Sequence, residues 1–505
     1  MVKGGGQGRA RPGSGLTPGR ARRIMGETGK IRLPAKAGRT QEGKRIMAAA
    51  PTVDVARIID DRKMDGFMWF LLILSFLIIT FDGYDISAIA FAGPLVIKAW
   101  GVAAPGPFMG VVFSASLFGM LFGAPVLGYL GDRFGRKTAT VLSSLIFGGF
   151  TLACCWATSL EDLRLLRFLA GLGIGGMMPN LIALNAEFAP KRIRATIIIL
   201  MFTGVTFGGA IPGWVSIYLA PSYGWQVIFF IGGALPILMA VAALFLLPES
   251  LKYLVVRGRR ARAERLLRRL APMLTVGADA QFIVADERKV SSVSPAQLFQ
   301  GGLAFITPLL WLCFSMNLMG FYFMVSWMPT ILKSNQVLTP DAAALATTLI
   351  QLGGTVGGLA ICRIVDSKGF LPVLVLFAVA VPAIAGIGYF ADQSQNLVLA
   401  SAFVAGFCVL GLQFGLNAAS GMIYPTAVRA NGSGWAFGIG RFGSIVGPIL
   451  GGYLVAQHLP LQQLFLIWTI PSCIGFLACL LLISLYKTRF NGLGLGRREA
   501  MDAAE

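Results

Sequence analysis

Charged residues and histidine are both scarce in this sequence of 505 residues. Asp, Glu, Lys and Arg make up 13% of the chain, about half of the roughly 25% that soluble proteins carry. There is one histidine, His458, which excludes a polyhistidine metal site and argues against Ser-His-Asp or Cys-His catalysis. We therefore expect neither a resident metal nor an enzyme activity.

The cysteines offer no alternative chemistry. They number seven, all lie in apolar stretches, and none has the spacing of a zinc site or a disulfide framework. The sequence also lacks a Walker loop, a GxSxG motif and an HExxH motif, and its first 46 residues lack the apolar core of a signal peptide. No cofactor is expected.

Apolar residues, in contrast, are abundant: they make up 56% of the chain, and the mean hydropathy is +0.73. They gather in twelve runs of about 20 residues, the length that spans roughly 30 Å of hydrocarbon. The runs are 67–91, 107–130, 138–157, 163–186, 195–219, 225–247, 303–328, 342–362, 370–390, 397–420, 432–456 and 462–486. This pattern predicts an all-α protein with twelve transmembrane helices surrounded by membrane lipid.

Basic residues are distributed unevenly over the loops between these runs. If the N-terminus is cytoplasmic, the five inner loops hold nineteen Lys and Arg residues and the outer loops hold three. The positive-inside rule then predicts a multi-pass protein of the bacterial inner membrane with both termini in the cytoplasm. The net charge of +20 is therefore a sign of topology, and no nucleic acid partner is expected.

The two halves of the chain align when the sequence is shifted by 235 residues. Pro190–Ala195 then falls on Pro425–Ala430, and Pro94 falls on Pro329. This predicts two parallel six-helix repeats, an arrangement in which transporters bind substrate between the halves near the bilayer midplane. The expected segments are a cytoplasmic N-terminus (1–66), a first bundle (67–247), a basic cytoplasmic linker (248–302), a second bundle (303–486) and a cytoplasmic tail (487–505).

Residues 1–46 differ from the rest of the chain. They are rich in Gly, Arg and Pro and carry twelve basic and two acidic residues, so we expect them to be disordered. Two explanations stay open. Either the start site is misassigned, with Met47 as the native first residue, or the segment is a basic tail that contacts anionic lipid.

Five ionisable residues lie inside the predicted spans, where charge is costly and usually marks a transport pathway. They are Asp82, Asp85, Arg167, Glu187 and Arg441. Asp82 and Asp85 are three residues apart and share one helix face. Two neighbouring carboxylates in a low dielectric cannot both ionise cheaply, so the pair is a candidate proton acceptor. The alternative is a helix-end pair that faces water.

Depths estimated from the helix rise suggest partners for the two arginines. Arg167 and Asp85 fall at a similar depth, so we expect Arg167 to pair with Asp85 or Asp82, with an arginine that reaches the outer interface as the alternative. Arg441 falls near the midplane, where its planar fork suits a substrate carboxylate. A salt bridge to the carboxylates of the first helix stays open for Arg441.

The loop between the second and third runs resembles the signature loop of the major facilitator superfamily. Its sequence is Gly128-Tyr-Leu-Gly-Asp132-Arg133-Phe-Gly135-Arg136-Lys137. Segments 167–173 and 248–250 resemble two further motifs of that superfamily. The resemblance implies a gate contact between Asp132 and the start of the eleventh helix. Glu187 is expected to join Arg133 or Arg136 in a cytoplasmic charge network.

The first helix narrows the resemblance. Asp82-Gly83-Tyr84-Asp85 resembles the DG(F/Y)D motif of the aromatic acid:H⁺ symporter family, as do segments 178–180, 326–330 and 434–441. The second copy of the signature loop departs from the pattern, with Cys362 in place of a glycine and Ser367 in place of an arginine.

The resemblance implies a proton-coupled importer of a hydroxybenzoate-like acid that works by alternating access, with H⁺ as the coupling ion. The predicted walls of the site are the aromatic residues Tyr84, Tyr322, Phe323, Trp327 and Trp435, and the predicted ligands for ring hydroxyls are Gln351, Gln413 and Asn417. A proton-antiport exporter and a substrate sensor on a transporter scaffold stay open as alternatives. We expect a monomer.

Overall fold

The computed structural model describes residues 52–60, 62, 64–102, 105–190, 192–270, 281–283, 295–334, 339–424 and 429–490. Residues 1–46 and most of the expected tail lie outside the described residues, as do the side chains of Cys362 and Ser367. Within the described part, twelve helices are long and apolar enough to cross a membrane, which confirms the predicted number of spans.

Each half of the chain contributes six of these helices. The first half forms α2 (Gly66–Trp100), α3 (Pro105–Phe134), α4 (Arg136–Ala153), α5 (Leu160–Phe188), α6 (Arg194–Tyr218) and α8 (Gln226–Leu246). The second half forms α11 (Ile306–Ser334), α12 (Pro340–Lys368), α13 (Leu371–Tyr389), α14 (Gln395–Ile423), α15 (Arg429–Ala456) and α17 (Ile470–Phe490). Shorter elements are α1 (Val55–Asp60), η1 (Cys154–Trp156), α7 (Ala220–Tyr223), α9 (Leu251–Val256), α10 (Arg260–Leu270), η2 (Pro295–Phe299) and α16 (Leu461–Ile467).

Local sequence explains where several helices begin and end. Ser159 and Asp162 form a capping box at the start of α5, and the Asp65 side chain caps α2. Helix α2 continues nine residues beyond its predicted end, as far as Gly101, which adopts the left-handed conformation (φ 62°) that favours glycine. The twelfth predicted span is divided, because α16 ends at Ile467 and α17 begins at Ile470.

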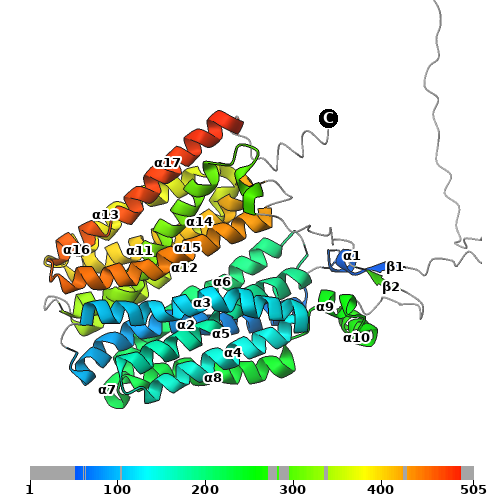
Figure 1. Ribbon diagram of the computed structural model, residues 1–505, viewed down its shortest axis with the longest axis horizontal. Coiled ribbons are helices and arrows are strands. Elements are labelled where there is room, and N and C mark those ends of the chain that lie inside the picture. The colour runs from blue at the N-terminus through cyan, green and yellow to red at the C-terminus, as the bar shows by residue number, and fades with distance from the viewer. Residues whose placement is uncertain are drawn as a thin grey trace, which may run out of the picture. The chain divides into compact units, whose positions relative to one another are not determined.

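The helices form two bundles that follow the two halves of the sequence. Figure 1 shows α2 to α8 together in blue to green, and α11 to α17 together in yellow-green to red. Three helix pairs join the bundles, namely α3 with α15, α6 with α12, and α2 with α11. These interfaces leave a cavity between the halves, which is described below.

The two bundles are closed against each other at one end. Near the start of α3, a Cβ on Gly106 would lie 2.4 Å from the carbonyl oxygen of Gly452, near the end of α15. Further along the same pair, the Ser114 hydroxyl donates to the carbonyl of Ile445 at 2.8 Å. At the other end of α15, Cβ atoms on Gly434 and Gly438 would meet nothing within 4 Å. The halves therefore touch at the end remote from Gly135 and separate toward it.

We call the end of the molecule that carries Arg133, Arg136, Lys137 and the helices α9 and α10 the basic face. The charge distribution of the sequence predicts that this face is cytoplasmic. The cavity between the halves opens toward it, since the exposed Asn417 lies close to the basic-face end of α14. In this structure, the cavity between the halves is therefore open at the basic face.

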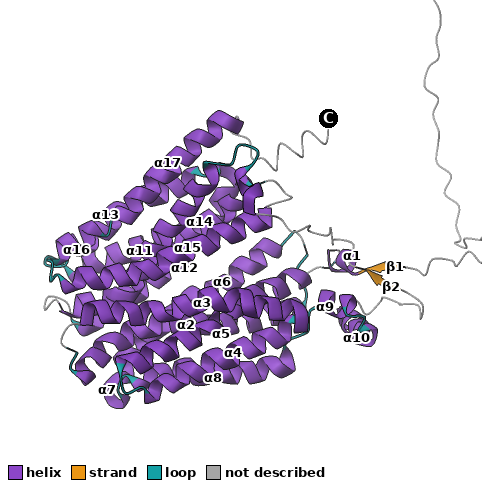
Figure 2. Ribbon diagram, viewed as in Figure 1, coloured by secondary structure: helices purple, strands orange, loops and turns teal. Residues whose placement is uncertain are grey.

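The linker contains more structure than a plain basic loop. Strand β1 (Thr52–Asp54) pairs in parallel with β2 (Gln281–Ile283), outside the membrane-spanning helices, and the predicted all-α fold class is confirmed (Figure 2). Helix α10 is amphipathic: its buried residues Ala263, Leu267 and Leu270 belong to the same apolar cluster as Val55 and Ile59 of α1. Its arginines remain on the exposed side.

Glycines bring helices into backbone contact. A Cβ on Gly171 would lie 2.1 Å from the Ser116 carbonyl oxygen, between α5 and α3. A Cβ on Gly208 would lie 1.7 Å from the Thr80 carbonyl oxygen, between α6 and α2. Such contacts replace the hydrophobic driving force that is missing between helices in lipid.

The substitution Gly208→Ala should force α6 away from α2, because the new methyl group meets rigid backbone. We expect a loss of about 1–3 kcal/mol of stability, the cost of overpacking a tight interior, measured as a lower melting temperature of the detergent-purified protein. Gly149→Ala is the matched control, since a Cβ there meets nothing within 4 Å. Equal melting temperatures for the two variants would contradict the close approach of α6 and α2.

Candidate functional site

A cavity of about 670 Å³ lies between the two bundles, within the size range of small-molecule sites. Its walls come from α2, α5 and α6 on one side and from α11, α12, α14 and α15 on the other. The lining residues are Gly83, Ile86, Met178, Ile182, Ile198, Ile199, Phe202, Val205, Thr206, Asn317, Leu318, Phe321, Tyr322, Gln351, Leu410, Gln413, Phe414, Asn417, Ala418, Ser420, Ser433, Gly434 and Phe437. Most are apolar, so the few polar groups must orient a ligand.

A smaller cavity of about 300 Å³ continues this space between α3, α5 and α15. It shares five wall residues with the larger one, namely Met178, Ile182, Phe202, Gly434 and Phe437. Arg441 lines the smaller cavity, and its guanidinium group lies over the Phe437 ring, 5.0 Å from the centroid. The two cavities form one space with a cationic group at one end.

Four of the predicted substrate-binding residues line the larger cavity. They are Tyr322, Gln351, Gln413 and Asn417. The polar wall has a further member, Asn317, which the sequence marked only as the counterpart of Asp82 at the 235-residue shift. Met178 and Phe437 lie in segments of the family resemblance, but nothing in the sequence identified either side chain as part of the wall.

The structure corrects the expectation that Tyr84 and Trp327 form walls of the site. The Tyr84 hydroxyl donates to the Ile228 carbonyl at 2.9 Å inside the first bundle. The Trp327 indole N–H donates to the Pro448 carbonyl at 2.8 Å, and its ring packs edge-on against Phe113. Buried Tyr and Trp residues need partners for their polar tips, and these two find them in backbone carbonyls away from the cavity.

The two other predicted aromatic residues also lie elsewhere. Phe323 packs against Trp468, with ring centroids 3.7 Å apart. Trp435 is 39% exposed and stacks on Trp311. The sequence pattern identified helices of the site correctly, but it could not decide which side of each helix faces the cavity.

Asp85 and Arg167 form a fully buried ion pair. The Arg167 Nη1 lies 2.5 Å from Asp85 Oδ1, and both side chains are 0% exposed. Arg167 also donates to the Asp85 carbonyl at 3.2 Å and to the Ser116 hydroxyl at 3.1 Å, while Thr151 donates to Asp85 Oδ1 at 3.1 Å. The predicted pairing of Arg167 with Asp85 is present, and the alternative of an arginine at the outer interface is wrong.

Asp82 is equally buried but differently surrounded. Its side chain is 0% exposed, and neither carboxyl oxygen has a hydrogen-bond partner among the described residues. It lies close enough to Arg441, Asp85 and Tyr322 to interact with them electrostatically. No Asp or Glu of the described chain lies within salt-bridge distance of Arg441, so the predicted alternative of a direct salt bridge is not formed.

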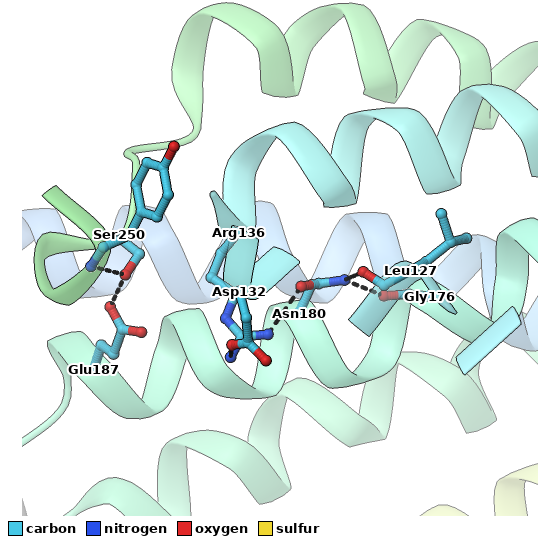
Figure 3. A network of polar contacts seen from close by, with 8 residues as sticks. Leu127, Asp132, Arg136, Gly176, Asn180, Glu187 and Ser250 are labelled. Carbon is cyan, nitrogen blue, oxygen red and sulfur yellow. Dashed lines mark hydrogen bonds and ion pairs between the residues drawn. The ribbon is translucent and has the colours of Figure 1, made fainter. Parts of the chain in front are cut away.

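The residues of the signature loop build a network at the basic face, which Figure 3 shows together with Glu187 and Ser250. Arg136 pairs with Asp132 and donates to Asn180 Oδ1 at 3.1 Å. Asn180 in turn donates to the carbonyls of Leu127 and Gly176, at 3.1 and 2.7 Å. The loop is thereby fixed to α5 next to Met178 and Pro179, which line the smaller cavity.

In the structure, Asp132 has a different partner from the expected one. Its side chain is 67% exposed and pairs with Arg136 of its own loop. The gate contact with the start of α15 is not formed among the described residues, because the halves are apart at this face. Arg133 instead donates to the Tyr129 hydroxyl at 3.2 Å. Gly128 has open space around it.

Glu187 lies in the expected charge network at the basic face, since Arg136 is close enough to interact with it electrostatically. Its direct hydrogen bond is to a neutral group, because its Oε2 accepts from the Ser250 hydroxyl at 2.5 Å. The neighbouring Glu249 accepts from the backbone N–H of Lys137 at 3.2 Å and of Ser250 at 2.9 Å. Burial raises the pKa of Glu249 above its ordinary value, although these hydrogen bonds act in the opposite direction.

Gly135 is required where α3 meets α4. Its φ of 108° is accessible to glycine and strained for other residues, and a Cβ there would lie 2.3 Å from the Glu249 carboxylate. Glu249 comes directly after α8, so this contact ties the end of the first bundle to its signature loop.

Comparison with known proteins gives a consistent result. The family model "Major Facilitator Superfamily" matches residues 75–338 and 310–498. The chain is 34% identical over 440 residues to the "4-hydroxybenzoate transporter PcaK" of Acinetobacter baylyi, covering 85% of this chain and 93% of the relative. It is 36% identical to the "Gallate transporter" of Pseudomonas putida, covering 85% of this chain and 94% of the relative.

A solved structure has the same fold. The partially occluded inward open conformation of the xylose transporter XylE from E. coli superposes with a TM-score of 0.62 at 16% identity. The match covers 84% of this chain and 98% of that chain. At this identity the similarity concerns the arrangement of the helices alone.

The Asp85–Arg167 ion pair should stabilise the protein only while both partners are present. Asp85→Asn leaves Arg167 buried without its counter-charge, and Arg167→Gln does the same to Asp85. Each single variant should cost about 3–5 kcal/mol, and the double variant should recover most of that loss. Thermal unfolding of the purified variants measures this.

Asp82→Asn is the control, because neither Asp82 oxygen is bonded to a described residue. It should melt at or above the temperature of the wild type. A double variant that is less stable than either single variant would contradict the pairing.

Proposed function

The chain belongs to the major facilitator superfamily, and from this premise we propose that it imports a small aromatic carboxylate across the bacterial inner membrane together with protons. Relatives that share about a third of its residues are named as transporters of 4-hydroxybenzoate, gallate and benzoate. Their common chemistry is an aromatic ring that bears a carboxylate.

The observation that carries the proposal is the composition of the cavity. Its walls are largely apolar, and its cationic group is Arg441, which has no carboxylate partner among the described residues. An arginine fork binds a carboxylate with two parallel hydrogen bonds. The ring of the bound acid would then lie between Phe202 and Phe437, which line both parts of the cavity.

Asp82 is the group we assign to the proton. Burial of an unpaired carboxylate is costly, so the neutral acid is its stable form in these surroundings. When Asp82 ionises, the cation that interacts with it is Arg441, and the two charges would compensate each other. Substrate carboxylate and ionised Asp82 therefore compete for one arginine, which couples proton binding to substrate binding.

Asp85 has a different role in this proposal. It is already neutralised by Arg167 and held by Thr151, so the pair fixes the helix that carries Asp82.

The proton has an energetic purpose, because moving one anion into a negative cytoplasm costs about 2.3 kcal/mol per 100 mV. One accompanying proton cancels this cost and adds the pH gradient.

Alternating access follows from the asymmetry of the two ends. The described arrangement is closed between α3 and α15 and open at the basic face. Rocking of the two bundles would open the first contact and bring α15 toward the signature loop. The exposed Asp132 and the open space at Gly434 and Gly438 are then available for the opposite closure.

Asp82→Asn should abolish accumulation of labelled 4-hydroxybenzoate against its gradient, because the amide cannot carry a proton. Exchange of labelled for unlabelled substrate across proteoliposomes should continue, since it needs no net proton movement. Asp392→Asn, at an exposed loop position, is the control. Normal uphill uptake by Asp82→Asn would reject the assigned proton site, and uptake driven by an opposite pH gradient would indicate an exporter.

Arg441→Ala should weaken binding of 4-hydroxybenzoate by about ten- to a hundredfold, the value of a hydrogen-bonded charge pair. Isothermal titration of the purified protein measures this directly. Arg164→Ala removes an exposed arginine paired with Glu161 and should leave the affinity unchanged. Wild-type affinity in Arg441→Ala would show that the carboxylate binds elsewhere.

A further inference from the structure

Two side-chain amides from different helices meet in the cavity wall. Asn317 of α11 donates from Nδ2 to Oε1 of Gln413 of α14, at 3.1 Å. Both residues line the larger cavity, and Asn317 is 3% exposed. They are 96 residues apart in sequence, so the contact exists only in the folded protein.

Each amide keeps one buried atom without a hydrogen-bond partner among the described residues. These atoms are Asn317 Oδ1 and Gln413 Nε2. If both amides are turned over, the same hydrogen bond forms in the other direction and again leaves one C=O and one NH₂ group. In either orientation the pair has one acceptor and one donor free for a ligand. Leaving these buried polar groups unpaired costs free energy.

We propose that the Asn317–Gln413 pair recognises a hydroxyl group on the ring of the transported acid. This inference rests on the proposed function. A phenolic hydroxyl is both a donor and an acceptor, so it matches both free groups of the pair. A carboxylate only accepts, and a hydrogen or methyl substituent does neither. The pair therefore selects hydroxylated acids over the unsubstituted acid.

The position of the pair specifies where on the ring the hydroxyl lies. Arg441 lines the part of the cavity between α3, α5 and α15, whereas the amide pair lies between α11 and α14. The residues common to both parts, Met178, Phe202 and Phe437 among them, lie where the ring would be. With the carboxylate on Arg441, the hydroxyl points away from it, at the 3- or 4-position of the ring.

The test compares ligands on the same purified protein. Binding of benzoate, 2-hydroxybenzoate and 4-hydroxybenzoate is titrated on the wild type, Asn317→Ala, Gln413→Ala and the double variant. The wild type should bind 4-hydroxybenzoate about tenfold more tightly than either other acid. Each single variant should reduce this ratio toward one, and the double variant should reduce it no further, because the pair acts as a unit.

Benzoate binding reports that each variant is folded, and Gln413→Met keeps the side-chain volume if the alanine variant is unstable. Asn396→Ala is the matched control: it removes an exposed amide of α14 that does not line the cavity and should leave the ratio as in the wild type. Equal loss of both 4-hydroxybenzoate and benzoate affinity in the pair variants would overturn the inference, as would a wild-type ratio of one. Failure of the wild type to bind any of these acids would overturn the proposed function as well.

Discussion

The cost of an unpaired charge in a low-dielectric interior governs where the ionisable groups of this protein lie. Arg167 and Asp85 compensate each other at 2.5 Å with no exposure to solvent. Glu187 accepts a hydrogen bond from Ser250 near the basic face. Of the five, Asp82 and Arg441 are the two whose side chains form no hydrogen bond or ion pair with a described residue. Because such groups are expensive to keep, we propose that Asp82 takes up a proton during the cycle and that Arg441, which stays charged, takes up an anion.

In the proposed mechanism, the same constraint connects the proton to the substrate. A protein with two fixed ion pairs in its centre would be stable but would bind neither a proton nor an anion. Here one ion pair, Asp85–Arg167, is fixed. The second cation, Arg441, lies near Asp82, whose carboxyl group can be neutral or ionised. The apolar wall strengthens the effect, since it excludes the water that would otherwise solvate Arg441 and Asp82. Binding and coupling thus depend on one local imbalance of charge.

Close packing supplies the rigidity that this arrangement needs. Gly208 and Gly171 allow helices of the first bundle to touch through their backbones, so each bundle can move as a body. At the basic face, Asn180 links the signature loop to the part of α5 that lines the smaller cavity. Direct contacts thus connect Arg136 to the wall around Arg441.

The sequence by itself determined the twelve spans, the two repeats, the five intramembrane charges and the family. The length of an apolar run and the free-energy cost of a charge in lipid can both be read from local sequence. It also predicted that Arg167 would pair with a carboxylate of α2. Only the tertiary structure decided that Asp85 is the paired carboxylate and Asp82 the unpaired one. It also placed Tyr84 and Trp327 in packing rather than in the site, and it brought Asn317 against Gln413. Helical periodicity defines which residues share a face, but the partner of that face is set by helices far away in the chain.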